Sequence, residues 1–252
     1  MIPVFITTVA QRAEFLPMLI ERAGGESCAF PVFDPEMKGV WFNTRRALER
    51  GIAYCTEHGM THFVTLQDDV WPVDEFQRHV TNAAAAISDR VFSLFGPFQL
   101  RGRAAVHLAQ EHAERVGAHW SMHDFTPAQG FVWPAIFAFA YLSWVDSLPN
   151  LFDLSHPMWG NKPNEYRYTD QDDHILNYYL TAVLGRKPLA TAPSLIEHLG
   201  NQSTLRSQFT GEYLDNRVRA QVYRSVLVRD AWNTIYAKST DMDCHEYKAG
   251  IT

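Results

Sequence analysis

Two adjacent aspartates at the end of an apolar run have the residue types and spacing best suited to chemistry in this chain. Residues 62–66 form strands readily, and they are followed by Gln67, Asp68 and Asp69. Ligands of open α/β sheets bind beyond the carboxyl ends of strands, and Asp is disfavoured within strands, so we expect both carboxylates to face such a crevice. Two hard oxygen ligands suit Mg²⁺ or Mn²⁺ bound together with substrate phosphate oxygens. A turn leading into Pro72 explains the same residues equally well.

A second acidic cluster opens a predicted helix at residues 172–184. Asp170, Asp172 and Asp173 lie within four positions of one another. Acidic residues at a helix start cap free N–H groups and complement the helix dipole, but three exceed what capping needs. A carboxylate on this rigid helix start could accept a proton from a substrate hydroxyl, and its acidic neighbours would raise its proton affinity. Asp172 and Asp173 are therefore the candidate catalytic residues.

A histidine follows in the segment 193–204, which reads as the exit of a strand. His198 could ligate a metal ion through its neutral imidazole. A single histidine is more often a hydrogen-bonded structural residue, and ten further histidines in the chain compete for the role.

Polar residues also follow the first two predicted strands, where the crevice would hold a base and a ribose. The candidates for binding a nucleotide are Thr7, Thr8, Arg12, Asp34, Lys38, Asn43 and Arg46. For Asp34, Asn43 and Arg46 taken singly, helix capping or a solvated face is the commoner role. Four tryptophans could stack on a sugar or nucleobase, although such residues more often belong to the core: Trp120, Trp133, Trp144 and Trp159.

Strands and helices alternate along the chain, which predicts an α/β fold of one domain. Apolar spacing and Gly or Pro breaks predict strands at 2–7, 29–33, 62–66 and 91–95, with helices at 15–23, 47–55 and 76–87 between them. Farther along we expect helices at 104–116, 134–148 and 172–184, and short strands at 118–121, 130–133 and 188–192. Apolar residues between 218 and 235 predict further helical packing.

Composition narrows the classes of function. The chain of 252 residues is 46% hydrophobic, enough for a sizeable core. It has no apolar run of about 18 residues and no signal-like start, so we expect a cytoplasmic protein. Its three cysteines form neither a close pair nor a metal-ligand spacing, and both nucleotide-binding glycine motifs, G-x-G-x-x-G and G-x-x-x-x-G-K-[ST], are missing.

The net charge of −6 argues against general nucleic-acid binding. Local basic residues could still contact phosphates, namely Arg101, Arg103, Arg206, Arg217 and Arg219.

Taken together and in order, these segments resemble GT-A-type nucleotide-sugar glycosyltransferases of the family 2-like kind. The likeness spans residues 1–205 and includes an N-terminal βαβ unit, Gln67-Asp68-Asp69, the acidic helix start at 172–176 and a late P-S-L-x-x-H-x-G-x-x-S segment. It implies a GT-A fold, a single Rossmann-like α/β/α sandwich with a mostly parallel central sheet. Residues 1–100 would bind the nucleotide sugar, 101–205 the acceptor, and 206–252 would form a helical extension packed on the same domain.

The resemblance also implies residue roles. Asp69 would hold Mn²⁺ or Mg²⁺ on the donor pyrophosphate, with His198 as a second metal or phosphate ligand, and Asp68 would contact the ribose or the metal shell. Asp173 or Asp172 would be the catalytic base. Gln67 stands where many relatives carry an acid, and its neutral amide supplies less charge to hold an ion.

The expected activity is therefore a metal-dependent, inverting hexosyl transfer from a nucleoside-diphosphate sugar such as a UDP-sugar. The acceptor could be a glycan, a lipid carrier, a protein or a hydroxymethylated DNA base. Two alternatives stay open: a non-catalytic sugar-nucleotide or glycan-binding module on the same fold, and a nucleotidyltransferase. The latter would need a basic triphosphate-binding turn near Thr7, where only Arg12 is available.

Overall fold

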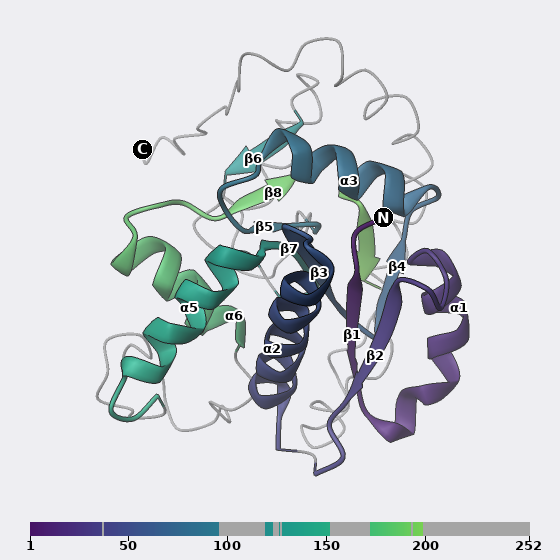
Figure 1. Ribbon diagram of the computed structural model, residues 1–252, viewed down its shortest axis with the longest axis horizontal. Coiled ribbons are helices and arrows are strands. Elements are labelled where there is room, and N and C mark those ends of the chain that lie inside the picture. The colour runs from purple at the N-terminus through teal and green to yellow at the C-terminus, as the bar shows by residue number, and fades with distance from the viewer. Residues whose placement is uncertain are drawn as a thin grey trace, which may run out of the picture.

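The computed structural model describes residues 1–36, 38–95, 119–122, 126, 128–151, 172–192 and 194–198. Its main sheet has seven strands in the order β2-β1-β3-β7-β5-β8-β6, and a second sheet pairs β4 with β9 (Figure 1). The strands are β1 (Val4–Thr8), β2 (Ala29–Phe33), β3 (His62–Gln67), β4 (Val70–Pro72), β5 (Phe92–Ser93), β6 (Trp120–Met122), β7 (Gly130–Pro134), β8 (Leu189–Thr191) and β9 (Ile196–His198).

Helices cover both faces of the main sheet. They are the 3₁₀ helix η1 (Ala10–Phe15), then α1 (Leu16–Arg22), α2 (Val40–His58), α3 (Phe76–Ala86), α5 (Ala135–Ser147), α6 (Asp172–Tyr178) and the π-helical turn η4 (Tyr179–Val183). Side-chain alternation along the strands builds the layers, because successive residues point to opposite faces. In β1, Val4 and Ile6 pack with α1 and α3, whereas Phe5 packs with α2, α5 and α6. The protein is therefore an α/β sandwich of three layers.

The sheet is mixed rather than mostly parallel, which corrects one expectation. β1 pairs in parallel with both β2 and β3, as the βαβαβ start predicts. However, β7 runs antiparallel between β3 and β5, and β6 is antiparallel to β8. Strands that are buried on both faces are apolar whichever way they run, so their sequence does not reveal their direction.

Several predicted elements are confirmed, most of them with shifted bounds. Strand β2 has the predicted bounds, and α2 ends before Gly59, whose φ of 65° suits glycine. Helix α2 begins at Val40, well before the apolar face that was expected to start at residue 47, and Trp41 in its first turn is buried. The predicted helix at 104–116, the segment 206–252 and the acceptor-half boundaries lie outside the described residues.

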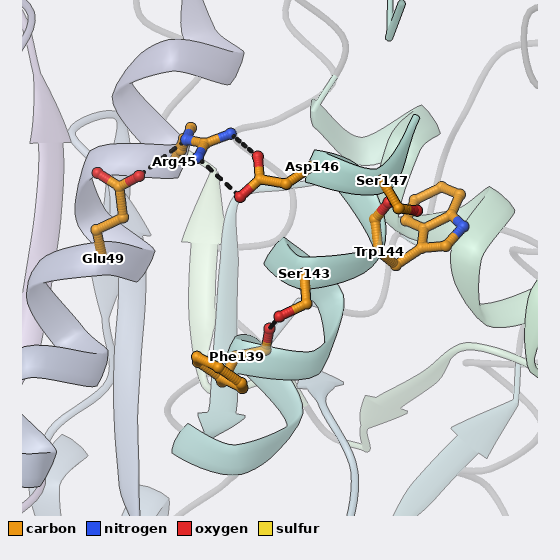
Figure 2. A network of polar contacts seen from close by, with 7 residues as sticks. All are labelled: Arg45, Glu49, Phe139, Ser143, Trp144, Asp146 and Ser147. Carbon is orange, nitrogen blue, oxygen red and sulfur yellow. Dashed lines mark hydrogen bonds and ion pairs between the residues drawn. The ribbon is translucent and has the colours of Figure 1, made fainter. Parts of the chain in front are cut away.

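A surface ion-pair network ties α2 to α5 (Figure 2). Arg45 donates to Glu49 of its own helix over 2.8 Å and to both carboxylate oxygens of Asp146 in α5 over 2.6 and 3.2 Å. These side chains are partly exposed, so the pair adds about 0–1 kcal/mol, and the apolar contacts between the helices contribute most of the stability.

No helix in the described part of the chain combines the length and apolar character needed to cross a membrane. Cys28 and Cys55 are free and buried, and burial raises the pKa of the Cys55 thiol to about 11. A thiol with so high a pKa is protonated and unreactive at neutral pH.

The contact between α2 and β3 predicts that alanine is unfavourable at position 51, although it is favourable at an exposed position of the same helix. A Cβ atom on Gly51 would lie 2.4 Å from ring carbons of Phe63. Gly51→Ala should therefore lower the free energy of unfolding by about 1–3 kcal/mol despite the better helix propensity of alanine. At the exposed position of Ala53 in the same helix, the reverse change Ala53→Gly should cost about 1 kcal/mol. Urea denaturation measures both, and a stabilised Gly51→Ala variant would contradict this packing.

Candidate functional site

The ends of three parallel strands bring the predicted site residues to one edge of the sheet. β1, β2 and β3 all run the same way, so Thr8, Asp34 and Gln67 lie at the same edge. Helix α1 lies on one face and α2 on the other (Figure 1). In the sheet, β2 and β3 lie on opposite sides of β1. Such a topological switch point is where open α/β sheets bind ligands.

Asp68 and Asp69 form a buried acidic pair in the turn between β3 and β4. Thr8 Oγ1 donates to Asp68 Oδ2 over 2.7 Å. Arg12 Nη1 lies 2.8 Å from Asp68 Oδ1 and 3.7 Å from Asp69 Oδ2, and all three charged side chains are buried. Burial raises the pKa of Asp68 to about 6 and outweighs Arg12 and Thr8, which lower the pKa, while Asp69 raises it further.

The two predicted metal ligands are brought to neighbouring backbone positions. β4 pairs antiparallel with β9, and the register sets His198 opposite Val70, the residue after Asp69. Two carboxylates match the oxygen ligands that Mg²⁺ and Mn²⁺ prefer, so the chemistry of the donor set fits a divalent ion. Among the side chains that the structure describes, however, no group of three or more His, Cys, Asp or Glu residues is poised to hold a metal. Arg12 already contacts both carboxylates.

The candidates on the nucleotide side make internal contacts. Asn43 Nδ2 donates to Thr8 O over 3.0 Å, and the same carbonyl accepts from Asp34 N over 3.0 Å. Asp34 Oδ2 accepts from Gly39 N over 3.0 Å, and Arg46 Nη1 lies 3.4 Å from Asp34 Oδ1. These contacts shape the connection between β2 and α2, the structural role that is commoner for such residues. Whether they also bind a nucleotide stays a prediction.

Two further candidates differ in exposure. Thr7 is buried, and its Oγ1 donates to Leu66 O over 3.1 Å, which links β1 to β3. Lys38 is half exposed and lies 2.5 Å from a carboxylate oxygen of Glu36, which lowers the pKa of Glu36. Of these two, Lys38 is the one that can reach a ligand outside the sheet edge.

The two candidate bases are in different environments. Asp172 is buried; its Oδ2 accepts from Thr44 Oγ1 over 2.6 Å and its Oδ1 from Asp173 N over 3.0 Å. Burial, followed by the nearby charge of Asp173, raises the pKa of Asp172 to about 7. Asp173 is partly exposed, and its Oδ1 accepts from His174 N over 2.8 Å. Asp172 is thus held by the protein, whereas Asp173 can meet a ligand.

A small, mainly apolar cavity lies between Asp172 and Gln67, the residue that precedes the acidic pair. It is lined by residues of β1, β3, β7, α2, α5 and α6, and its polar lining residues include Thr7, Thr44, Thr65, Gln67, Tyr141 and Asp172. Its volume of about 10 Å³ admits about one water molecule, so a nucleotide cannot enter it. The hydroxyl of Tyr141 is buried without a hydrogen-bond partner within the described ranges, and a water here would satisfy it.

Sequence reasoning missed the residues that support the acidic ones. Thr44 holds Asp172, Tyr141 lines the cavity, and Thr65 Oγ1 accepts from Trp133 Nε1 over 2.8 Å. Thr44 follows the candidate Asn43 directly, but nothing in a single sequence pairs it with a residue 128 positions away.

The structure describes three of the four candidate tryptophans and none of the five predicted basic contacts. Trp120 and Trp133 belong to the core, and Trp144 stacks on Tyr178. Trp159, Asp170 and the five predicted basic contacts lie beyond the described part of the chain: Arg101, Arg103, Arg206, Arg217 and Arg219.

Neither the models of known protein families nor the curated proteins give a match to this chain. The geometry of the strand ends is therefore the main evidence about function.

The buried state of Asp172 predicts how stability depends on pH. The folded protein binds this proton more tightly than the unfolded chain, where the pKa is about 3.9. The contribution of Asp172 is therefore most favourable below pH 4 and is lost as the pH rises towards 7. The free energy of unfolding of the wild type relative to Asp172→Asn should fall by more than about 1 kcal/mol between pH 4 and 8.

Thr44→Val provides the companion variant, because it removes a hydrogen bond that favours the Asp172 carboxylate. Its stability relative to the wild type should fall further as the pH rises. Urea denaturation at both pH values measures these differences, and a wild type to Asp172→Asn difference that does not change with pH would show that Asp172 is not buried as described.

Proposed function

We propose that this protein is a glycosyltransferase that moves a sugar from a nucleoside-diphosphate donor, such as a UDP-sugar, to an acceptor hydroxyl with inversion at the anomeric carbon. The observation that carries the proposal is the convergence of two acidic regions from distant parts of the sequence. Gln67, which precedes the acidic pair, lines the same cavity as Asp172. Transfer needs a site for an anionic leaving group beside a carboxylate base, and this sheet edge offers groups for both.

The donor half of the proposed site is built on Asp68 and Asp69. Asp69, together with Asp68 and with His198 across the β4–β9 pair, would hold Mn²⁺ or Mg²⁺. Such an ion neutralises the charge that develops on a diphosphate leaving group. Thr8 orients the Asp68 carboxylate, and Arg12 balances the charge of the pair before any ligand binds.

Asp173 is the better candidate for the base. Both carboxylate oxygens of Asp172 are already hydrogen bonded inside the protein, whereas Asp173 is partly exposed. In the proposed step the acceptor oxygen forms a bond to the anomeric carbon and its proton passes to Asp173. The bond from that carbon to the diphosphate oxygen breaks, and its electron pair leaves with the diphosphate. A single displacement of this kind inverts the anomeric centre.

The alternatives have less support. A nucleotidyltransferase needs several cations for a triphosphate near Thr7, and Arg12 is the only basic residue in that stretch of the sequence. A binding module needs no general base, so the presence of two acidic regions favours an enzyme. The acceptor belongs to one of the hydroxyl-bearing classes already named: a glycan, a lipid carrier, a protein or a modified DNA base.

Binding of the donor product is the first test. Uridine diphosphate with Mn²⁺ or Mg²⁺ should stabilise the protein by roughly 2.7 kcal/mol at a hundredfold its Kd. Thermal unfolding measures the shift. Asp69→Asn should fold normally, because only a charge is removed, but it should lose the part of the stabilisation that depends on the metal ion. The donor site would be refuted if no nucleoside diphosphate raised the Tm of the wild type with either ion.

Hydrolysis of nucleotide sugars, with water as the acceptor, tests the base without knowledge of the natural acceptor. Asp173→Asn should keep the affinity for donor and ion but slow transfer by two to four orders of magnitude, about 3–5 kcal/mol in the barrier. Asp172→Asn is the paired control and should slow transfer less, since Asp172 acts through the position of the helix start. Near wild-type rates for both single variants and for the double variant would exclude catalysis by this cluster.

A further inference from the structure

Arg12 lies where a cation for the acidic pair would lie. Its Nη1 atom contacts Asp68 Oδ1 over 2.8 Å and lies 3.7 Å from Asp69 Oδ2. The side chains of Arg12, Asp68 and Asp69 are 10%, 7% and 10% exposed, so water screens these charges little. The guanidinium is therefore the counter-charge of the pair in the protein as described.

A guanidinium and a divalent ion compete for these two carboxylates, because each cation disfavours the other as a neighbour. Two positive centres within a few ångströms repel each other strongly where the dielectric is low. Removal of the guanidinium alone is also unfavourable, because it would leave two buried carboxylates without a counter-charge. Exchange of one cation for the other avoids both costs.

Arg12 has unused capacity to bind an anion. Its Nη2 atom is buried and has no hydrogen-bond partner among the described residues. Arg12 lies in η1, directly after the carboxyl end of β1, and so at the edge where the proposed diphosphate would bind. A planar guanidinium matches the geometry of phosphate oxygens and donates to two of them at once.

We propose that Arg12 is an internal cation that competes with a divalent ion for Asp68 and Asp69, and that after the exchange its guanidinium binds the diphosphate of the donor. The identity of the anion rests on the proposed function, whereas the competition for the carboxylates does not. The ion and the diphosphate then bind cooperatively, since each favours the arrangement that the other needs, and the coupling is reciprocal. The ion alone binds weakly.

Titration of the full chain with Mn²⁺ alone tests the competition. The free ion is followed by its electron paramagnetic resonance signal at pH 8. Arg12→Met should bind Mn²⁺ roughly tenfold or more tightly than the wild type, within the range usual for coupled sites. Arg45→Met is the matched control, because it removes an arginine from carboxylates on the surface (Figure 2) and should leave the affinity unchanged. An Arg12→Met protein that binds Mn²⁺ no more tightly than the wild type overturns the proposal.

Two further measurements keep the test decisive. In the double variant Arg12→Met with Asp69→Asn, the gain in Mn²⁺ affinity should disappear, and a gain that persists would place the ion elsewhere. If Arg12→Met does not fold, the exchange can be tested on the wild-type protein by NMR. The resonances of the Arg12 guanidinium nitrogens, assigned by comparison with Arg12→Lys, should shift as Mg²⁺ is added. Resonances that do not move while Mg²⁺ binds overturn the exchange.

A separate measurement tests whether the Arg12 guanidinium binds the diphosphate. At saturating Mn²⁺, the Kd for uridine diphosphate should rise roughly fivefold or more in Arg12→Met. An unchanged Kd overturns this part of the proposal. If Arg12→Met gains Mn²⁺ affinity but the wild type binds no nucleoside diphosphate, the proposed function fails while the cation exchange stands. If the wild type binds uridine diphosphate but Arg12→Met binds Mn²⁺ no more tightly than the wild type, the cation exchange fails while the proposed function stands.

Discussion

The parallel pairing of β1 with both β2 and β3 is the constraint on which the rest of this structure depends. Because the three strands end at one edge, residues from three separate segments meet there without long loops. The backbone of β1 is hydrogen bonded on both sides, so its last residue, Thr8, is a rigid anchor. Asp68 bonds to the Thr8 hydroxyl, and Asn43 and Asp34 bond to its carbonyl. Any change that shifts this pairing would move the acidic pair as well.

Much of the first half of the fold follows from local sequence patterns. Apolar spacing and glycine breaks locate β1, α1, β2, β3 and α3, because each element buries a face with its own period. The acidic pair is equally visible, since Asp is unusual beside a buried strand. The direction of β7 and the pairing of β4 with β9 are not visible, because antiparallel neighbours come from distant parts of the chain and share the same apolar composition.

The environment of each acidic residue could not be predicted from its type. Asp172 and Asp173 are adjacent and chemically identical, yet only Asp172 is buried and bonded to Thr44. The register of α6 against α2 decides which of the two faces inward, and that register is set by packing of Ile175 and Leu176 in the core. Likewise, the sequence places Arg12 beside the expected nucleotide site, but it does not reveal that the guanidinium contacts Asp68 and Asp69. The need to neutralise two buried carboxylates therefore determines where the Arg12 side chain lies.

The Arg12 contact has a consequence for how the protein is made. Small zinc proteins without their metal are unfolded, because metal binding supplies their folding free energy, and their folding therefore depends on metal supply. Here the chain carries its own cation for Asp68 and Asp69, so folding of this edge needs no metal. If a divalent ion binds here as proposed, its loss would leave Asp68 and Asp69 paired with Arg12, so this edge would not open and expose the chain to proteolysis.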